Sequence, residues 1–134
     1  QNKKVLVILT DGVNLISQNG RFCERANPKY TSEYTAYGYL GEDVNNHGRL
    51  SGITNFNTAS RILNDRLTET CNNIKAKDIT IYTIVFQLED EQTVELFKNC
   101  ASSPDKFFNS PNNETLRASF RAIGAELSNL RIAQ

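Results

Sequence analysis

The feature that most constrains the fold is the run KVLVILTDG, which spans residues 4–12. Five consecutive apolar residues, Val5 to Leu9, lie between a lysine and the turn Thr10-Asp11-Gly12. A continuous apolar run is typical of a strand buried on both faces, as in a parallel sheet covered by helices. We expect Gly12 to turn the chain with a positive φ, so that the Asp11 carboxylate points out of the edge where open α/β sheets bind ligands. A plain Asp-Gly turn explains the same residues equally well.

The size and charge of the chain exclude some classes of protein. The chain has 134 residues, enough for one domain with a core, and its formal net charge is zero. Lysine and arginine are scattered, which argues against a nucleic-acid surface. No apolar run approaches membrane-spanning length, and no signal-peptide pattern is present. Because the sequence contains no methionine, we expect it to be a fragment of something longer.

A long polar segment follows the first strand, from residue 13 to about residue 57. Loops of this length inside a compact domain are uncommon and are usually either functional or disordered. The segment carries four tyrosines, a residue type suited to contact surfaces because it combines a large area with a polar tip. These are Tyr30, Tyr34, Tyr37 and Tyr39. The alternative, which we favour somewhat, is that the rings pack the loop onto its own domain.

The next part of the chain reads as a helix, a strand and a short helix. Apolar residues at three- and four-residue steps predict a helix over 58–77, with Asn57 as N-cap and Asp78 as the stop. The β-branched run 79–86 predicts a strand, which completes a parallel βαβ unit with a right-handed crossover. The acidic residues 89–91 suit the start of a helix better than a metal site.

A third strand over 106–109 and a final helix complete the pattern. Ser110 and Pro111 suit the N-cap and first position of that helix. Its expected inner face consists of Leu116, Phe120, Ile123, Leu127 and Leu130. The chain is therefore an α/β fold in one partial domain, divided into a strand with the TDG turn (1–12), a long insertion (13–57) and an α-β-α-β-α unit (58–134). A doubly wound sheet usually has five or six strands, so half the sheet is missing.

The sequence resembles a known family. The run KKVLVILTDG and the α/β unit that ends the chain resemble the C-terminal half of a von Willebrand factor A domain. The runs TSEYTAYGYLGE, CNNIKAKDITIYTIVF, LFKNCASSPDKFFNSPNNETLRASFRAIG and LSNLRIAQ are similar to tight-adherence (Tad) pilus assembly proteins of the TadG-like kind. The likeness covers nearly the whole chain. It implies a bacterial envelope protein with a membrane anchor in a preceding part.

The resemblance implies a three-layer, doubly wound, Rossmann-like fold of which this chain holds the C-terminal half. The strand Val5–Leu9 would be the fourth of the complete sheet. It also implies a metal-ion-dependent adhesion site for Mg²⁺ or Mn²⁺, to which this chain would contribute Asp11, with Thr10 and Gly12 shaping the loop. The Asp-x-Ser-x-Ser motif that supplies most ligands in the family is absent here. Asp11 alone should therefore not hold a divalent ion tightly.

The resemblance also bears on the three cysteines. They form no CxxC pair and the chain has a single histidine, so a zinc site of the usual spacing is not expected. Cys71 and Cys100 stand where the family carries a cysteine pair, which implies a disulfide in an oxidising, periplasmic or extracytoplasmic location. Two buried free thiols are the alternative. Cys23 would be the odd thiol, either free or intermolecular.

The leading functional hypothesis is a non-enzymatic module for protein–protein interaction or assembly. Its partners would be other pilus or envelope proteins. Alternatives are a structural α/β fragment without metal binding, or a fragment of a phosphoryl-transfer enzyme that uses Asp11. The enzyme would need a second acid and a Lys or Ser/Thr at neighbouring strand ends, which the sequence does not locate. The apolar free edge of the Val5–Leu9 strand predicts pairing with another chain, either as a homodimer or with a retained N-terminal fragment.

Overall fold

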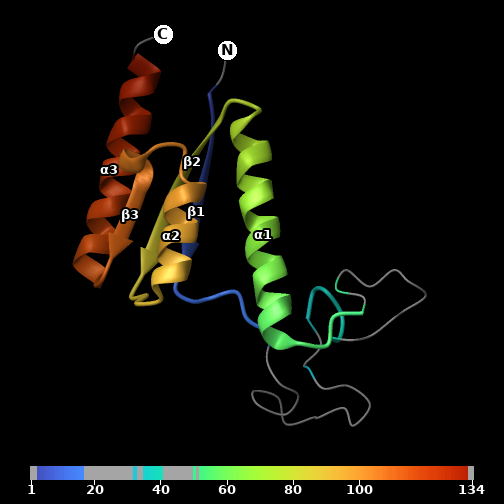
Figure 1. Cartoon of the computed structure of the whole chain (residues 1–134). Helices are drawn as coiled ribbons and strands as arrows, with labels where there is room; N and C mark the ends of the chain where they lie inside the picture. The colour runs from blue at the N-terminus through green and yellow to red at the C-terminus, as the bar shows by residue number, and fades with distance from the viewer. Residues whose placement is uncertain (1–2, 17–31, 33–34, 41–49, 51, 133–134) are drawn as a thin grey trace. The chain divides into compact units, whose positions relative to one another are not determined.

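The computed structural model describes residues 3–16, 32, 35–40, 50 and 52–132, with only the backbone for 129–132. The chain divides into two compact units, one formed by residues 1–13 with 67–134 and the other by residues 14–66. Its elements follow the predicted order (Figure 1). They are β1 (Lys4–Thr10), α1 (Phe56–Lys75), β2 (Ile79–Phe86), α2 (Glu91–Cys100), the 3₁₀ turn η1 (Pro104–Lys106), β3 (Phe107–Ser110) and α3 (Asn113–Ile132).

A parallel sheet with strand order β1-β2-β3 forms the centre of the first unit. The register sets Leu6 beside Ile81 and Ile84 beside Phe108. The middle strand β2 is buried from Ile81 to Val85, since strands lie on both of its sides and helices cover both of its faces. The fold is mixed α/β, as the sequence predicts. That it is part of a doubly wound von Willebrand factor A fold remains a prediction.

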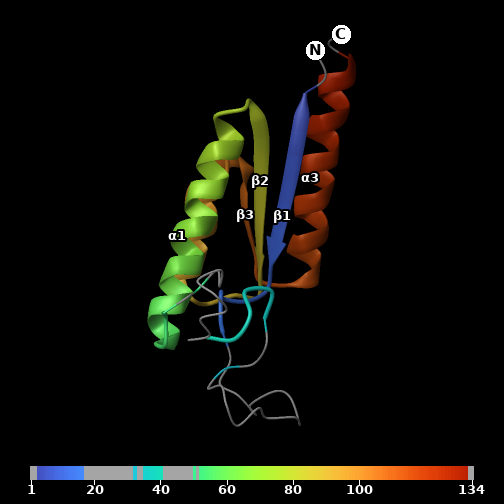
Figure 2. The same cartoon turned by 90° about the vertical axis from the view of Figure 1, so that its right-hand side faces the viewer.

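Helices cover the two faces of this sheet (Figure 2). One face is covered by α2 and by the part of α1 that begins at Leu67. The buried residues on this face are Cys71, Cys100 and Ile81, and Ile8 and Ile74 pack against them. On the other face lies α3. Its contacts with the sheet form a second cluster, made of Tyr82, Ile84, Ile123, Val5, Phe108, Leu116 and Leu127. No helix in the described ranges is long and apolar enough to cross a membrane.

The second unit has a core of its own. Its buried residues are Ile16, Leu40, Leu50, Ala59 and Leu63, and partly buried side chains pack against them. The buried hydroxyl of Ser32 accepts a hydrogen bond of 2.6 Å from the Leu40 amide. A tight turn, closed by two backbone hydrogen bonds between Thr35 and Gly38, has Gly38 at φ 83°. Such a positive φ suits glycine, which has no Cβ to clash.

Both ends of α1 are set by single residues. Asn55, not the predicted Asn57, caps the helix: its Oδ1 accepts the Thr58 amide hydrogen bond at 2.9 Å. The helix begins at Phe56, which packs against the core of the second unit, so the start is two residues earlier than the periodicity indicates. After α1, Asp78 has a φ of 55°. This left-handed conformation ends the helix at the expected residue, where glycine would be easier.

The predicted start of α3 is wrong. Ser110 belongs to β3 and is buried, and its hydroxyl lies 3.0 Å from that of Ser119. Its carbonyl accepts a hydrogen bond from the Gln87 amide, so Ser110 is committed to the sheet. The cap is Asn112, whose Oδ1 accepts the Thr115 amide hydrogen bond at 2.9 Å. Asparagine is among the best N-cap residues, and here it takes the role that Ser110 cannot.

The prediction that β1 is buried on both faces is also wrong. Val7 and Leu9 are 39% and 45% exposed. Both lie on the face that α3 covers elsewhere, but α3 packs mainly on β2 and β3. At β1 only Val5 joins the cluster beneath that helix.

Candidate functional site

The TDG turn lies at the carboxyl end of β1, as expected. The Thr10 hydroxyl donates a hydrogen bond of 2.8 Å to the Gly12 carbonyl and accepts one of 3.2 Å from the Gly12 amide. Asp11 is exposed at the tip of this turn. Gly12 is not among the described residues with positive φ, so the expectation for it is wrong. The side chain of Thr10, rather than glycine geometry, holds the turn.

The ends of the neighbouring strands supply no carboxylate that could act together with Asp11. The parallel register brings the ends of β2 and β3 to the same edge of the sheet, where they contribute Gln87 and Ser110. The Ser119 hydroxyl donates to the Thr115 carbonyl at 2.9 Å, so Ser110 must donate to Ser119. The Ser110 hydroxyl is therefore buried and engaged. Neither position supplies the second acid that a phosphoryl-transfer role would require.

The residues at this edge do not fit a divalent cation by themselves. Mg²⁺ and Mn²⁺ prefer about six oxygen ligands, usually with more than one from the protein. Within the described ranges, no three His, Cys, Asp or Glu side chains come together as a metal site. Asp11 is the single carboxylate that the TDG turn offers. That Asp11 binds a metal ion together with ligands from outside this chain remains a prediction.

The acidic residues after β2 form a helix start, as the sequence indicates. Asp90 is the N-cap of α2, and its carboxylate accepts the Thr93 amide hydrogen bond at 2.8 Å. This hydrogen bonding holds the pKa of Asp90 below its usual value. Three nearby glutamates line a shallow depression together with Asn109 of β3. They are Glu89, Glu91 and Glu95.

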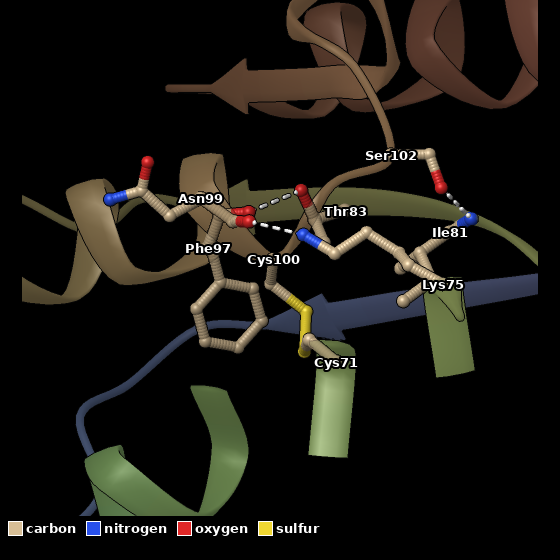
Figure 3. Close-up of a disulfide and its surroundings, with 8 residues drawn as sticks. All are labelled: Cys71, Lys75, Ile81, Thr83, Phe97, Asn99, Cys100 and Ser102. Atoms are coloured by element: carbon tan, nitrogen blue, oxygen red, sulfur yellow. Dashed lines mark hydrogen bonds between the residues drawn. A yellow bond between two sulfur atoms is a disulfide. The ribbon is translucent and has the colours of Figure 1, made fainter. Parts of the chain in front are cut away.

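A disulfide joins Cys71 of α1 to Cys100 of α2, the pair that the resemblance implies (Figure 3). The two Cα atoms are 5.3 Å apart, and 29 positions separate the residues in the sequence. Both cysteines are almost fully buried against Ile81 in the middle strand. The bridge therefore fastens two helices to each other on the same face of the sheet.

Polar contacts around the bridge hold the last turn of α2. The Thr83 hydroxyl donates to the Phe97 carbonyl at 2.8 Å, and the Lys75 ammonium donates to the Asn99 carbonyl at 2.9 Å (Figure 3). The final carbonyls of a helix lack intrahelical partners, so these two bonds satisfy them. Beyond the helix, Ser102 makes two hydrogen bonds to the backbone of Ile81. Hydrogen bonds to the backbone of α2 and β2 therefore surround the disulfide.

An ion-pair network fastens η1 to α3. Lys106 contacts Glu126 at 2.8 Å and Asp105 at 2.9 Å, and its ammonium lies 5.2 Å from the centre of the Tyr82 ring. The Lys106 hydrogen bond lowers the pKa of Glu126, and the carboxylates raise the pKa of Lys106. Hydrogen bonds from Ser103 and then Lys106 lower the pKa of Asp105 to about 2. Burial is the main cause that raises the pKa of Tyr82. The network is structural.

Two of the four tyrosines proposed as a contact surface can be placed. Tyr37 packs against the core of the second unit, and the guanidinium of Arg66 lies 5.6 Å from the centre of its ring. Tyr39 is partly buried. Tyr30 and Tyr34, like Cys23, lie outside the described residues. At Tyr37 the packing matches the alternative in which the rings serve their own domain.

The apolar surface at β1 is the remaining candidate. Phe120 of α3 is 49% exposed, although the sequence pattern places it on the inner face. The hydroxyl of Ser119 faces β3, and each helical residue turns by about 100°. Ile123, Leu116 and Phe120 therefore follow one another around the helix, and Phe120 lies on the flank away from β3, towards β1. We call Val7, Leu9 and Phe120, with the edge of β1 that pairs with no other strand among the described residues, the β1 surface.

Sequence reasoning anticipated the free edge but missed Phe120. The signal that could have found it is Ser119, a polar residue within the helix next to an apolar stripe. Because Ser119 is buried against β3, α3 is rotated about its own axis relative to the orientation that the apolar stripe predicts. Phe120, at one edge of that stripe, is therefore exposed to solvent.

Comparisons with known proteins concern the fold. No protein-family profile and no curated protein matches the sequence. Among solved structures, the chain is similar to the pilus adhesin SpaC from Lactobacillus rhamnosus GG, with a TM-score of 0.52 and 18% sequence identity. The likeness covers 93% of this chain and 16% of the SpaC chain. At this identity it indicates a shared fold, and the chain spans a small part of that protein's length.

Proposed function

We propose that the chain is a non-enzymatic module for protein–protein interaction or assembly at the bacterial cell envelope. The observation that carries the proposal is the β1 surface. In the described part of the chain, β1 is an end strand of a parallel sheet, with Val7 and Leu9 exposed beside its unpaired edge. Parallel sheets are normally covered on both faces, and an apolar open edge is normally protected.

The disulfide supports an extracytoplasmic location, because such bridges persist in oxidising compartments. The similarity in fold to part of a pilus adhesin is compatible with a pilus-related role. The finer proposal is that the chain is the C-terminal half of a von Willebrand factor A domain in a Tad-type pilus assembly protein. In that setting β1 would be the fourth strand, the partner at its edge would be a retained N-terminal fragment that carries the rest of the sheet, and Asp11 would be one ligand of a site completed by other residues.

The proposal is tested in the periplasm of a bacterium that assembles Tad pili. A photo-crosslinking benzoylphenylalanine replaces Val7 on the β1 surface, and in a matched control it replaces Lys98, an exposed residue of α2. We expect covalent adducts from position 7 and none from position 98. Equal labelling from both positions, or no adduct from position 7, would overturn the proposal.

A further inference from the structure

The TDG turn contains an aspartate followed directly by a glycine. In such a pair, the amide nitrogen of the second residue can attack the side-chain carboxyl group of the first. The reaction is intramolecular, so its rate depends on how closely the two groups can approach. Glycine allows the closest approach, because it has no Cβ and its backbone rotates most freely. Asp11–Gly12 is therefore the kind of sequence that favours this attack most.

The surroundings of the pair leave room for the reaction. Asp11 is exposed, and a Cβ placed on Gly12 would meet no atom within 4 Å. The other described aspartates differ, because each is followed by a residue with a side chain and three of them lie in or cap a helix or 3₁₀ turn. They are Asp65, Asp78, Asp90 and Asp105. Among the described aspartates, Asp11 is thus the one suited to cyclise.

The chemistry uses no reagent other than water. The nitrogen of Gly12 forms a bond to Cγ of Asp11, and its N–H proton leaves as water together with the hydroxyl of the carboxyl group in its acid form. The product is a succinimide ring. Water then opens the ring at either carbonyl. Breaking the bond between nitrogen and Cγ returns aspartate, whereas breaking the original peptide bond leaves isoaspartate, with the main chain running through Cγ.

The Thr10 hydroxyl opposes this attack. It accepts a hydrogen bond of 3.2 Å from the Gly12 amide and donates one of 2.8 Å to the Gly12 carbonyl. It therefore fixes the orientation of both polar groups of the residue that must attack. To reach Cγ, the nitrogen has to turn towards the Asp11 side chain, and its N–H has to leave the hydroxyl. Reaction in the folded chain thus requires local opening of the turn.

We propose that Asp11–Gly12 is a self-modification site that converts to isoaspartate, and that the Thr10 hydroxyl limits the rate of this conversion in the folded chain. In the product, the main chain between Thr10 and Gly12 is longer by one atom. The remaining carboxylate is attached directly to Cα, so it reaches less far from the edge where open α/β sheets bind ligands. The inference goes beyond the proposed function, because it holds whichever partner meets the β1 surface.

The test follows isoaspartate at position 11 in purified chain kept at neutral pH for several weeks. Fragmentation mass spectrometry locates it, and an Asn19→Gln background removes the Asn-Gly sequence from the same tryptic peptide. Thr10→Val keeps the β-branched shape but loses the hydroxyl. It should speed conversion about fivefold, the factor that corresponds to one net hydrogen bond of about 1 kcal/mol. Thr10→Ser, the matched control, keeps the hydroxyl and should convert at nearly the wild-type rate.

Gly12→Ala is the control for the chemistry. The structure accommodates it, since its Cβ meets nothing and Gly12 is not among the described residues with positive φ. It should slow conversion severalfold. Equal rates for folded wild type and folded Thr10→Val would overturn the role of the hydroxyl. So would folded wild type that converts as fast as wild type in urea, a comparison that needs no variant. If no isoaspartate forms at position 11 even in urea, the site itself is refuted.

Urea also separates folding from intrinsic reactivity. In the unfolded chain the hydrogen bonds to Thr10 are absent, so wild type and Thr10→Val should convert at the same rate. A difference between them that persists in urea would show that the substitution acts on the chemistry and not through the folded turn, and it would overturn the proposal. Circular dichroism confirms that each variant is folded in the absence of urea.

Discussion

Reduction of the Cys71–Cys100 disulfide should destabilise the first unit strongly. The bridge closes a loop with a sequence separation of 29. The chain-entropy relation then gives about 3.6 kcal/mol at 25 °C, because the reduced unfolded chain gains the freedom of that loop. Marginal stabilities of small domains are about 5–15 kcal/mol. The loss is therefore a large fraction of the total.

The assay is urea unfolding followed by circular dichroism, on oxidised and reduced protein in a Cys23→Ser background. Reduction keeps both side chains in place, so it leaves no cavity where the two buried sulfurs lie. With an m-value of about 1.5–2 kcal/mol per molar, the midpoint should fall by about 2 M urea. A Cys71→Ala/Cys100→Ala variant should lose at least as much, since it also removes buried sulfur. A difference below about 1 kcal/mol would refute the entropic reasoning.

Three smaller predictions follow from the caps, the ion pairs and the TDG turn. Asn112→Ala should cost about 1 kcal/mol of unfolding free energy in a urea titration, because α3 loses its cap. Lys106→Met should lower stability at pH 7 by about 1 kcal/mol. The pKa values of Asp105 and Glu126 are lowered in the folded state, so their stabilisation is present above about pH 4 and lost as pH falls towards 2. Unfolding midpoints at pH 7, 4 and 2.5 should therefore converge for the two proteins; a constant gap contradicts this. Millimolar Mg²⁺ or Mn²⁺ should leave the melting temperature nearly unchanged, and a large shift abolished by Asp11→Asn would show that further ligands exist.

The order of elements follows from the sequence because the local signals agree. The β-branched run of β2 and the apolar stripe of α1 each have one consistent interpretation, and their alternation predicts a parallel sheet. The ends of helices are harder. Ser110 and Asn112 are both good caps, and the choice depends on a hydrogen bond between Ser110 and Ser119 that exists only in the folded chain.

The candidate site was predictable only in part. The position of Asp11 at the end of β1 follows from the strand pattern, whereas the turn geometry depends on the hydroxyl of Thr10. Exposure at β1 could not be inferred from its composition. The same apolar run suits a covered strand and an uncovered one, and the difference depends on where α3 packs.

The rotation of α3 is a tertiary property as well. A helical stripe of apolar residues defines a face about 100° wide, but packing decides which edge of that stripe is buried. Here Ser119 takes the place nearest β3, and Phe120 is displaced into solvent. The β1 surface thus depends on where α3 packs and on how it is rotated about its axis, and Ser119 is the sequence signal of that rotation.

The central claim is that β1 presents an open edge for another protein. Amide hydrogen exchange of Val5–Thr10 in the dilute monomer measures this most directly. Alternate amides along an unpaired edge have no partner, so about half of them should exchange as fast as a solvated chain, while the amides of β2 stay protected. Uniform slow exchange along β1 in the dilute monomer would show that the edge is already covered within the chain, and it would contradict the claim.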